Sequence, residues 1–98
     1  MREGDLQTKV LKYLNSLSKC MAENVRGTAS QSGRADINAC YKGRCIKIEL
    51  KLNEESYSAT KQQKLYLKRW KAAGAIVGVC YTLEDVKKLL EDVDNDDS

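Results

Sequence analysis

Hydrophobic side chains recur with helical spacing near both ends of the chain. In the first stretch they stand three or four positions apart, at Leu6, Val10, Leu14 and Leu17, which predicts an amphipathic helix over about residues 3–18. The last stretch begins with Thr82 and Asp85, a pair typical of a helix N-terminus. Apolar residues at helical spacing follow it, at Leu83, Val86, Leu89, Leu90 and Val93. We therefore expect a helix near each end.

Between these helices, apolar and polar residues alternate, which is the pattern of β-strands with one buried face. Two alternating runs, over about residues 34–41 and 44–52, are separated by Lys42-Gly43. A two-residue loop with glycine at its second position suits a type I′ hairpin turn. A short, weak strand is also expected within residues 24–32, where small and polar residues predominate.

One more helix and one more strand complete the predicted fold. Thr60 and Gln63 have the spacing of a capping box, and the helix that they open is expected to run to about Ala73 and to end at Gly74. The continuous apolar run over residues 75–81 predicts a buried strand. The order α-β-β-β-α-β-α predicts a single α/β domain over residues 1–92, with a mixed β-sheet flanked by helices.

The polar positions of the hairpin bring two acids and a lysine together. With Cys40 opposite Cys45, the same register sets Asp36 opposite Glu49, and Lys51 faces the same side two residues further on. Like charges on directly opposed residues are destabilising. On an ordinary exposed face, residues of opposite charge at these two positions would be more stable. Two carboxylates at this separation suit a hard divalent cation, which takes oxygen ligands.

Such a site can hydrolyse a phosphodiester bond. We expect Asp36, Glu49 and the backbone carbonyl of Leu50 to bind Mg²⁺, with Mn²⁺ able to substitute. The cation would lower the pKa of its bound water and polarise the phosphate, while Lys51 would orient that water or stabilise the developing charge. The competing interpretation is a hairpin whose acids merely face solvent.

The composition excludes several other chemistries. The chain contains no histidine, which removes Ser-His-Asp and Cys-His catalysis. Its four cysteines include no C-x-x-C pair, so we expect reduced thiols and no structural zinc site. No apolar run approaches the roughly 20 residues of a membrane span, and the N-terminus lacks the layout of a signal peptide. We therefore expect a cytoplasmic protein that does not bind a membrane.

Charge is unevenly distributed along the chain. The net charge is +3, but the last eight residues hold five acids and no base, which leaves +8 for residues 1–90. A basic body favours a polyanionic partner, first of all nucleic acid. The alternative is an ordinary solvated surface rich in lysine. Residues 93–98 form an acidic tail that we expect to be disordered.

The motifs, in their order and spacing, resemble a nuclease family. Gly33-Arg34-Ala35-Asp36 with Ile48-Glu49-Leu50-Lys51 on the next strand resembles the PD-(D/E)xK nuclease superfamily. Glu3 on the first helix, the Thr60–Gln63 pair and the strand and helix over residues 72–90 resemble more specifically the VRR-NUC (virus-type replication-repair nuclease) family. The resemblance covers all but the acidic tail and implies a restriction-endonuclease-like core. It departs at Ala35, where the family often has proline, but this position performs no chemistry.

The resemblance implies further site residues. The family has a glutamate on the first helix that reaches the metal directly or through water, and Glu3 matches it better than Asp5 does. A family glutamine corresponds to Gln63, or otherwise to Gln62. Ordinary explanations compete, because a first-turn acid stabilises the helix dipole and a capping-box glutamine satisfies the helix N-terminus.

Contacts with DNA are expected from residues before the catalytic acid and from the middle helix, namely Ser30, Ser32, Arg34, Lys61 and Lys64. In the alternative interpretation the lysines of that helix, together with Lys68 and Arg69, form only a solvated face.

Small members of the family look like Holliday-junction resolvases, homodimers whose two active sites cut symmetry-related strands. The resemblance therefore implies a Mg²⁺-dependent, structure-selective DNA endonuclease that acts as a homodimer, with a phage and its host cytoplasm as the suggested setting. The aromatic residues Tyr57, Tyr66 and Trp70 either pack at the dimer interface or, for Trp70, in the core. Two other functions stay open: a less selective nuclease for flaps, nicks or single strands, and a non-catalytic nucleic-acid-binding module.

Overall fold

Helices and strands follow one another in the predicted order, α-β-β-β-α-β-α. The computed structural model describes residues 3–25, 37–51 and 61–96, except for the side chains of Glu3, Gln63 and Asp96. Its elements are α1 (Glu3–Ser16), β1 (Cys20–Asn24), β2 (Ile37–Tyr41), β3 (Arg44–Leu50), α2 (Lys61–Ala72), β4 (Ile76–Cys80) and α3 (Leu83–Asp96). Within these three ranges, no helix has the length and apolar character needed to cross a membrane.

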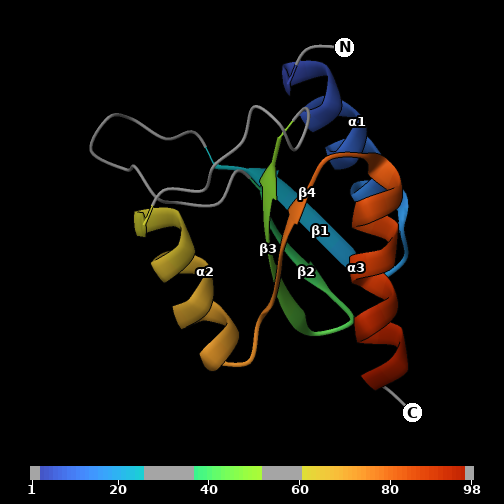
Figure 1. The fold of residues 1–98 in the computed structure, drawn as a ribbon. Helices are drawn as coiled ribbons and strands as arrows, with labels where there is room; N and C mark the ends of the chain where they lie inside the picture. Colours follow the sequence, from blue (N-terminus) through green and yellow to red (C-terminus); the bar gives the residue numbers. More distant parts are fainter. Residues whose placement is uncertain (1–2, 26–36, 52–60, 97–98) are drawn as a thin grey trace.

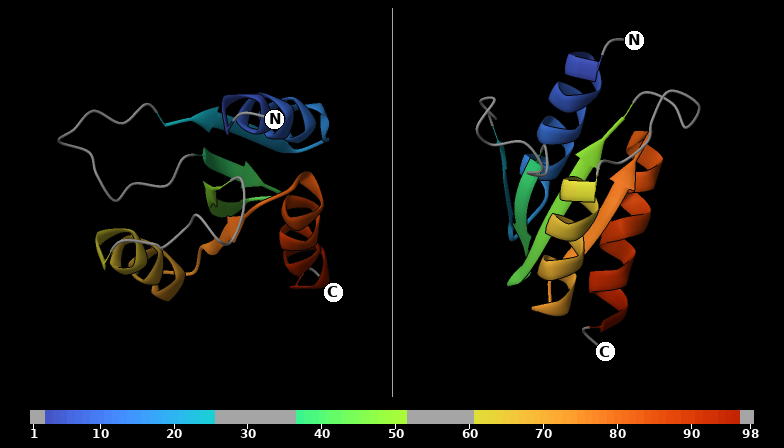
Figure 2. Two further views of the ribbon diagram at one scale, coloured as in Figure 1. Left: turned by 45° about the horizontal axis from the view of Figure 1, so that its top comes forward. Right: turned by 60° about the vertical axis from the view of Figure 1, so that its left-hand side comes forward.

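The strands form one mixed sheet in the order β1-β2-β3-β4. Neighbouring strands are antiparallel from β1 to β3, and β4 lies parallel to β3. Helices α1 and α3 lie side by side on one face, and α2 lies on the other (Figures 1 and 2). Strand β3 is therefore covered on both faces, and residues 46–50 are all buried. The predicted α/β domain with a mixed sheet is confirmed.

The core fills the space between the sheet and the pair of helices α1 and α3. Each of these helices presents the apolar residues predicted from its spacing. They pack against the alternate apolar side chains of β2 and β3. The fully buried side chains of this core include Val10, Leu14, Ile37, Ile46, Ile48, Leu50 and Val86. Packing of one amphipathic face, rather than helix propensity, supplies most of the stability of such helices.

The hairpin turn has the predicted geometry. Lys42 and Gly43 have φ angles of 52° and 82°, and positive φ at both central positions defines a type I′ turn. The register follows from it, with Tyr41 opposite Arg44 and Cys40 opposite Cys45. The predicted hairpin register is therefore confirmed over the residues described.

Strand β1 lies earlier in the chain than predicted. We expected a strand within residues 24–32, but β1 covers Cys20–Asn24 and pairs antiparallel with β2, and residues 26–32 lie outside those described. The side-chain amide of Asn15 in α1 holds the outer edge of this strand. Its nitrogen donates to the carbonyl of Ala22 at 3.0 Å, and its oxygen accepts from the Ala22 N–H at 2.8 Å.

The end of α2 is set by Gly74, as predicted. Gly74 has a φ of 107°, its N–H donates to the Lys71 carbonyl at 3.0 Å, and the next N–H, from Ala75, donates to the Trp70 carbonyl at 3.0 Å. These two bonds form a Schellman motif. The strand that follows was expected to be buried, but residues 76–79 are only half-buried. The reason is that β4 is an edge strand, with a neighbouring strand on one side only.

Helix α3 begins at the predicted cap and ends later than expected. The Asp85 N–H donates to Thr82 Oγ1 at 3.1 Å, and Asp85 Oδ2 accepts from the Thr82 N–H at 3.2 Å. The helix continues to Asp96, past the predicted start of the acidic tail at residue 93. Val93 is in the core at 2% exposure, and Asp94 Oδ1 accepts hydrogen bonds from Lys42 Nζ at 2.7 Å and Tyr41 Oη at 3.1 Å. These contacts attach the last turns to the hairpin.

Candidate active site

The candidate site lies on the face of β3 that is turned toward α2. Alternate residues of a strand point to opposite faces, and Ile46, Ile48 and Leu50 enter the core with α1 and α3. Lys47 and Glu49 therefore project from the other face. They are the buried charged residues among those described, with exposures of 6% and 2%. Two ionisable side chains on a central strand, where a sheet covered by helices on both faces is usually apolar, mark this face as unusual.

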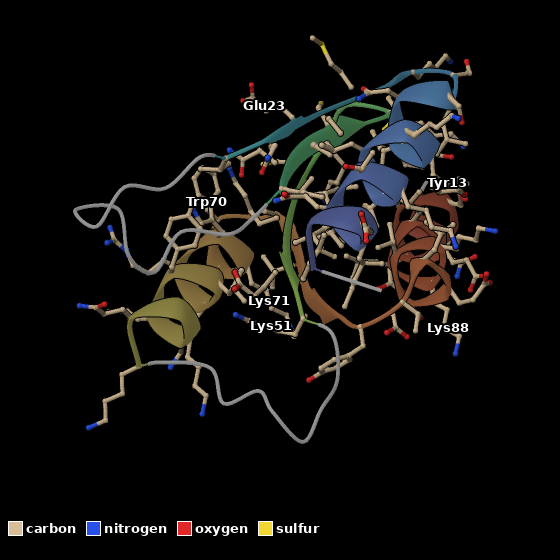
Figure 3. All side chains as sticks on the ribbon, turned by 90° about the horizontal axis from the view of Figure 1, so that it is seen from above. Tyr13, Glu23, Lys51, Trp70, Lys71 and Lys88 are labelled. Atoms are coloured by element: carbon tan, nitrogen blue, oxygen red, sulfur yellow. The ribbon has the colours of Figure 1, made fainter. Side chains whose placement is uncertain are left out.

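Glu49 lies beside Lys51 at the end of β3. Lys51 Nζ is 3.5 Å from Glu49 Oε1, and the two side chains are 27% and 3% exposed. The Lys51 N–H donates to the Cys80 carbonyl at 3.0 Å, so pairing with β4 continues through Lys51 and fixes its side chain on the same face as that of Glu49. Figure 3 shows Lys51 extending from the end of β3 toward the side of the sheet where α2 lies.

The Glu49–Lys51 pair combines a buried carboxylate with a more exposed ammonium. Withdrawal of a carboxylate from water costs several kcal/mol of solvation free energy. A nearby cation or hydrogen-bond donors must offset this cost. The Lys51 ammonium supplies a cation within ion-pair distance of Glu49. Because Lys51 is the more exposed partner, its ammonium is the part of the pair that an external anion could reach.

Several predicted site residues lie outside the part of the chain that the structure describes. Among them are Asp36, the second predicted carboxylate, and the predicted phosphate contacts Ser30, Ser32 and Arg34. The described pairing of β2 with β3 ends at Ile37 opposite Ile48, one residue short of the predicted pair of Asp36 with Glu49. Tyr57, one of the aromatic residues considered for an interface, also lies outside the described residues.

The remaining predicted residues are placed in part. Glu3 begins α1 and Gln63 lies in the first turn of α2, but their side chains are not among those described. Their alternatives, Asp5 and Gln62, are both exposed. The predicted DNA contacts on α2 are also exposed, at Lys61 and Lys64. The structure thus brings Glu49, Leu50 and Lys51 together.

The donor set at the end of β3 is the kind that a hard cation uses. The carboxylate of Glu49 and the backbone carbonyl of Leu50 are oxygen donors, which suit Mg²⁺ and Mn²⁺ better than softer metals. Within residues 3–25, 37–51 and 61–96 there is no cluster of three His, Cys, Asp or Glu side chains able to hold a metal. Any divalent site here must therefore take further oxygen ligands from the rest of the chain or from water.

Lys47 is a residue of this face that sequence reasoning did not assign. Its Nζ donates to Asn38 Oδ1 at 2.9 Å and lies 3.9 Å from the centre of the Trp70 ring. Because Trp70 belongs to α2, this cation–π contact joins the helix to the sheet beside the Glu49–Lys51 pair. The sequence contains an indication of this position. Lys47, Glu49 and Lys51 are alternate residues of one predicted strand, so their side chains point to the same face.

The cysteines are free thiols with different surroundings. Cys40 is exposed, Cys20 and Cys45 are half-buried, and Cys80 is buried. Burial, followed by the nearby Asp85 carboxylate, raises the pKa of the Cys80 thiol to about 12. Burial also raises the pKa of Cys20. A thiol of raised pKa stays protonated and is a poor nucleophile, so burial disfavours nucleophilic chemistry at these two thiols.

Comparison with known proteins identifies the fold. A solved structure described as "VRR_NUC domain" superposes with a TM-score of 0.72 at 23% sequence identity, covering 91% of this chain and 94% of that chain. A second, described as "VRR_NUC domain protein", has a TM-score of 0.73 at 18% identity, covering 94% of this chain and 87% of that chain. No protein-family model and no curated protein matches the sequence. The chain therefore has the fold of VRR_NUC domains over nearly its whole length.

Proposed function

We propose that this chain is a metal-dependent DNA endonuclease of the VRR-NUC family and, more specifically, a resolvase of four-way junctions. The observation that carries the proposal is the Glu49–Lys51 pair, with 3.5 Å between Oε1 and Nζ, at the end of a central strand in a fold shared with VRR_NUC domains. The spacing of this pair is that of the E-x-K half of a PD-(D/E)xK motif.

The residues of this site have separate roles in the proposal. Bound by Asp36, Glu49 and the Leu50 carbonyl, and by Glu3 directly or through water, Mg²⁺ or Mn²⁺ would supply a water of lowered pKa and a Lewis acid for the phosphate. The described hairpin register supports the inclusion of Asp36, because one further antiparallel pair after Ile37 and Ile48 would set it opposite Glu49.

Lys51 would act on the reacting groups themselves. Its ammonium lies beside the buried carboxylate and its side chain is 27% exposed, so it would be able to meet both the attacking water and a phosphate oxygen. A cation held in this position stabilises the negative charge that develops on the phosphate. Gln63 would complete the site by orienting the same water from the first turn of α2.

The distribution of charge supports DNA as the substrate. Helix α2 carries five lysine or arginine residues and no acid, whereas α3 carries six acids and two lysines. The two helices lie on opposite faces of the sheet (Figure 2), so the basic helix is on the face of the Glu49–Lys51 pair. Phosphate contacts by basic side chains position a nucleic acid without reading its sequence, which suits a nuclease selective for structure.

Homodimer formation completes the proposal. Resolution of a four-way junction requires two cuts in symmetry-related strands, and a two-fold dimer presents two equivalent sites. The proposed enzyme is thus a dimer on its substrate.

The test is cleavage of a labelled four-way junction beside a duplex, a flap and a single strand of matched length. Each substrate is incubated with Mg²⁺, Mn²⁺ or EDTA and with the wild type, Glu49→Gln or Glu91→Gln. Glu91 is an exposed acid on α3, so its variant controls for the change of charge. The proposal expects paired cuts in the junction that require a divalent cation, persist in Glu91→Gln and disappear in Glu49→Gln.

Other results would revise the proposal at different levels. Equal cleavage of every substrate would leave a nuclease and remove the resolvase. Binding of the junction without cleavage under any metal would favour a non-catalytic binding module. Cleavage that persists in Glu49→Gln would remove the site described here. Sedimentation of the protein with and without the junction tests the dimer separately.

A further inference from the structure

A strip of apolar surface runs along α2 between its basic side chains. It borders a shallow groove of about 480 Å³ lined by Gln62, Leu65, Tyr66, Arg69, Trp70 and Ala73. These residues recur every three or four positions, so the groove follows the helix axis. Leu65 is 58% exposed, and only one other large hydrophobic residue among those described, Met21, is as open to solvent.

The aromatic part of the groove is held in place from the sheet side. The Lys47 ammonium lies 3.9 Å from the centre of the Trp70 ring. The centres of the Tyr66 and Trp70 rings are 6.1 Å apart, and the ring planes form an angle of 56°. Both rings are half-buried. They therefore form a fixed aromatic wall, next to which Leu65 projects into solvent.

Cations flank this apolar strip on the same helix. Lys61, Lys64, Lys68 and Arg69 are all exposed, and α2 contains no acid. Protein–protein interfaces are depleted of lysine and enriched in aromatic residues and arginine. A strip with several lysines at its border therefore suits a polyanion better than a second protein surface.

We propose that this groove binds unstacked nucleobases of a nucleic acid whose phosphates contact the lysines of α2. Exposed aromatic side chains within a basic surface form the stacking platform that single-stranded segments use, and aliphatic side chains such as leucine enter base steps that are opened. A continuous duplex offers no free base faces, whereas a branch point or a single strand does. The proposal rests on the proposed function for its substrate class, and it adds the part of the substrate that is recognised.

The chain carries its own probe for this site, because Trp70 is its only tryptophan. Wild-type protein in EDTA, which prevents cleavage, is titrated with a single-stranded oligonucleotide and with a duplex of equal length while Trp70 fluorescence and oligonucleotide anisotropy are recorded. The single strand should quench Trp70 emission and bind more tightly than the duplex at the same salt concentration.

Three variants separate stacking from charge. Leu65→Ala should weaken single-strand binding by about tenfold, because the apolar side-chain surface that a base would cover is lost, and should leave duplex binding within about twofold. Lys68→Gln should weaken both and reduce the salt dependence of single-strand binding by about 0.7 in the log–log slope. Lys88→Gln, which removes an exposed lysine from α3 on the far side of the sheet (Figure 3), should change neither.

The outcomes distinguish this inference from the proposed function. Unchanged single-strand affinity in Leu65→Ala, or no response of Trp70 to any oligonucleotide, would overturn the groove as a base-binding site even if the enzyme cleaves junctions. A Leu65→Ala variant that loses self-association instead of DNA affinity would assign the groove to a second copy of the chain and would also overturn the inference. Single-strand binding that depends on Leu65 without any metal-dependent cleavage would support the groove and remove the nuclease.

Discussion

Glu49 and Lys51 lie side by side on one face of the sheet, with the carboxylate buried and the ammonium partly open to solvent. Because of this difference in exposure, the carboxylate is shielded from bulk water while the ammonium is accessible to an anion in solution. Their separation of two residues on a strand fixes this arrangement, and continued pairing of Lys51 with Cys80 maintains it.

Replacement of Lys51 should affect the chemical step more than DNA binding. Lys51→Met removes the charge and keeps much of the side-chain volume, so we expect junction cleavage to slow by about 10²-fold or more, as when a single electrostatic stabiliser is lost. Binding in EDTA should stay within about threefold, since one phosphate contact contributes little to the total. Single-turnover cleavage and anisotropy measure the two quantities. Lys71→Met on α2 is the matched control, and equal losses in both variants would contradict a catalytic role.

Contact between Lys47 and Trp70 should contribute measurably to stability. A cation–π pair removed from solvent is worth about 2 kcal/mol or more, and an exposed one about 0.5–1 kcal/mol. With Lys47 at 6% exposure, we expect a coupling energy of about 1–2 kcal/mol between Lys47→Met and Trp70→Leu. Urea unfolding followed by circular dichroism of both single variants and the double variant measures it. Additive single effects would show that the ring and the ammonium do not interact.

The contacts of Asp94 predict a pH dependence of stability. The hydrogen bond that Lys42 donates, and then the one that Tyr41 donates, lower the pKa of the Asp94 carboxyl, and donation to Asp94 raises the pKa of Lys42. A lowered carboxyl pKa contributes stability above the unfolded-state value of about 4 and loses it as the pH falls through the folded-state value. A raised lysine pKa contributes below about 10.5 and loses its contribution as the pH rises through the folded-state value.

We therefore expect Asp94→Asn to be less stable than the wild type near neutral pH. The difference should shrink in acid, below the folded-state pKa of Asp94. Thermal unfolding of both proteins over a series of pH values measures it, with Asp92→Asn, an exposed acid of the same helix, as the control. A difference that is the same at every pH would mean that the ion pair does not carry the effect.

Thiol reactivity should separate the cysteines by burial. With a pKa of about 12, Cys80 has almost no thiolate at neutral pH, and the thiolate is the form that reacts. Iodoacetamide should therefore modify the exposed Cys40 in the native protein and leave Cys80 intact. Mass spectrometry of the digested protein locates the label, and the same reaction in urea should modify all four cysteines. Comparable labelling of Cys80 and Cys40 in the native protein would contradict the packing described.

Gly74 should be costly to replace although its surroundings are open. A Cβ at this position would meet nothing within 4 Å, but φ is +107°, a backbone conformation that disfavours side chains. We expect Gly74→Ala to lose about 1 kcal/mol or more in unfolding free energy. Gly74→Asn should lose less, because asparagine tolerates positive φ better. Equal losses in chemical denaturation would point to a cause other than backbone conformation.

The sequence predicted the helices and the hairpin because their signals are local. Thr82 with Asp85 and the helix-ending Gly74 act within a few residues, and the two-residue turn at Lys42-Gly43 determines the register of β2 and β3. The same register led to Glu49 and Lys51 on one face. These features depend on residues a few positions apart in the chain and on the alternation of apolar and polar residues in the hairpin. Both can be read from a single sequence.

What the sequence did not predict depends on contacts between distant residues. Strand β1 has no strong β pattern of its own, and its position follows from pairing with β2 and from the Asn15 amide in α1. The half-burial of β4 follows from its place at the edge of the sheet. The role of Lys47 could not be predicted, because its contact with Trp70 depends on how α2 packs on the sheet.

The two hydrogen bonds between Asn15 and Ala22 have a consequence for assembly. An edge strand with free N–H and C=O groups invites another strand to add to the sheet. At the middle of β1 the N–H and carbonyl of Ala22 are bonded to the side-chain amide of Asn15, in place of the backbone of a further strand. A second molecule would have to displace both bonds to extend the sheet there. Addition of a strand from a second molecule is thus disfavoured at the middle of β1.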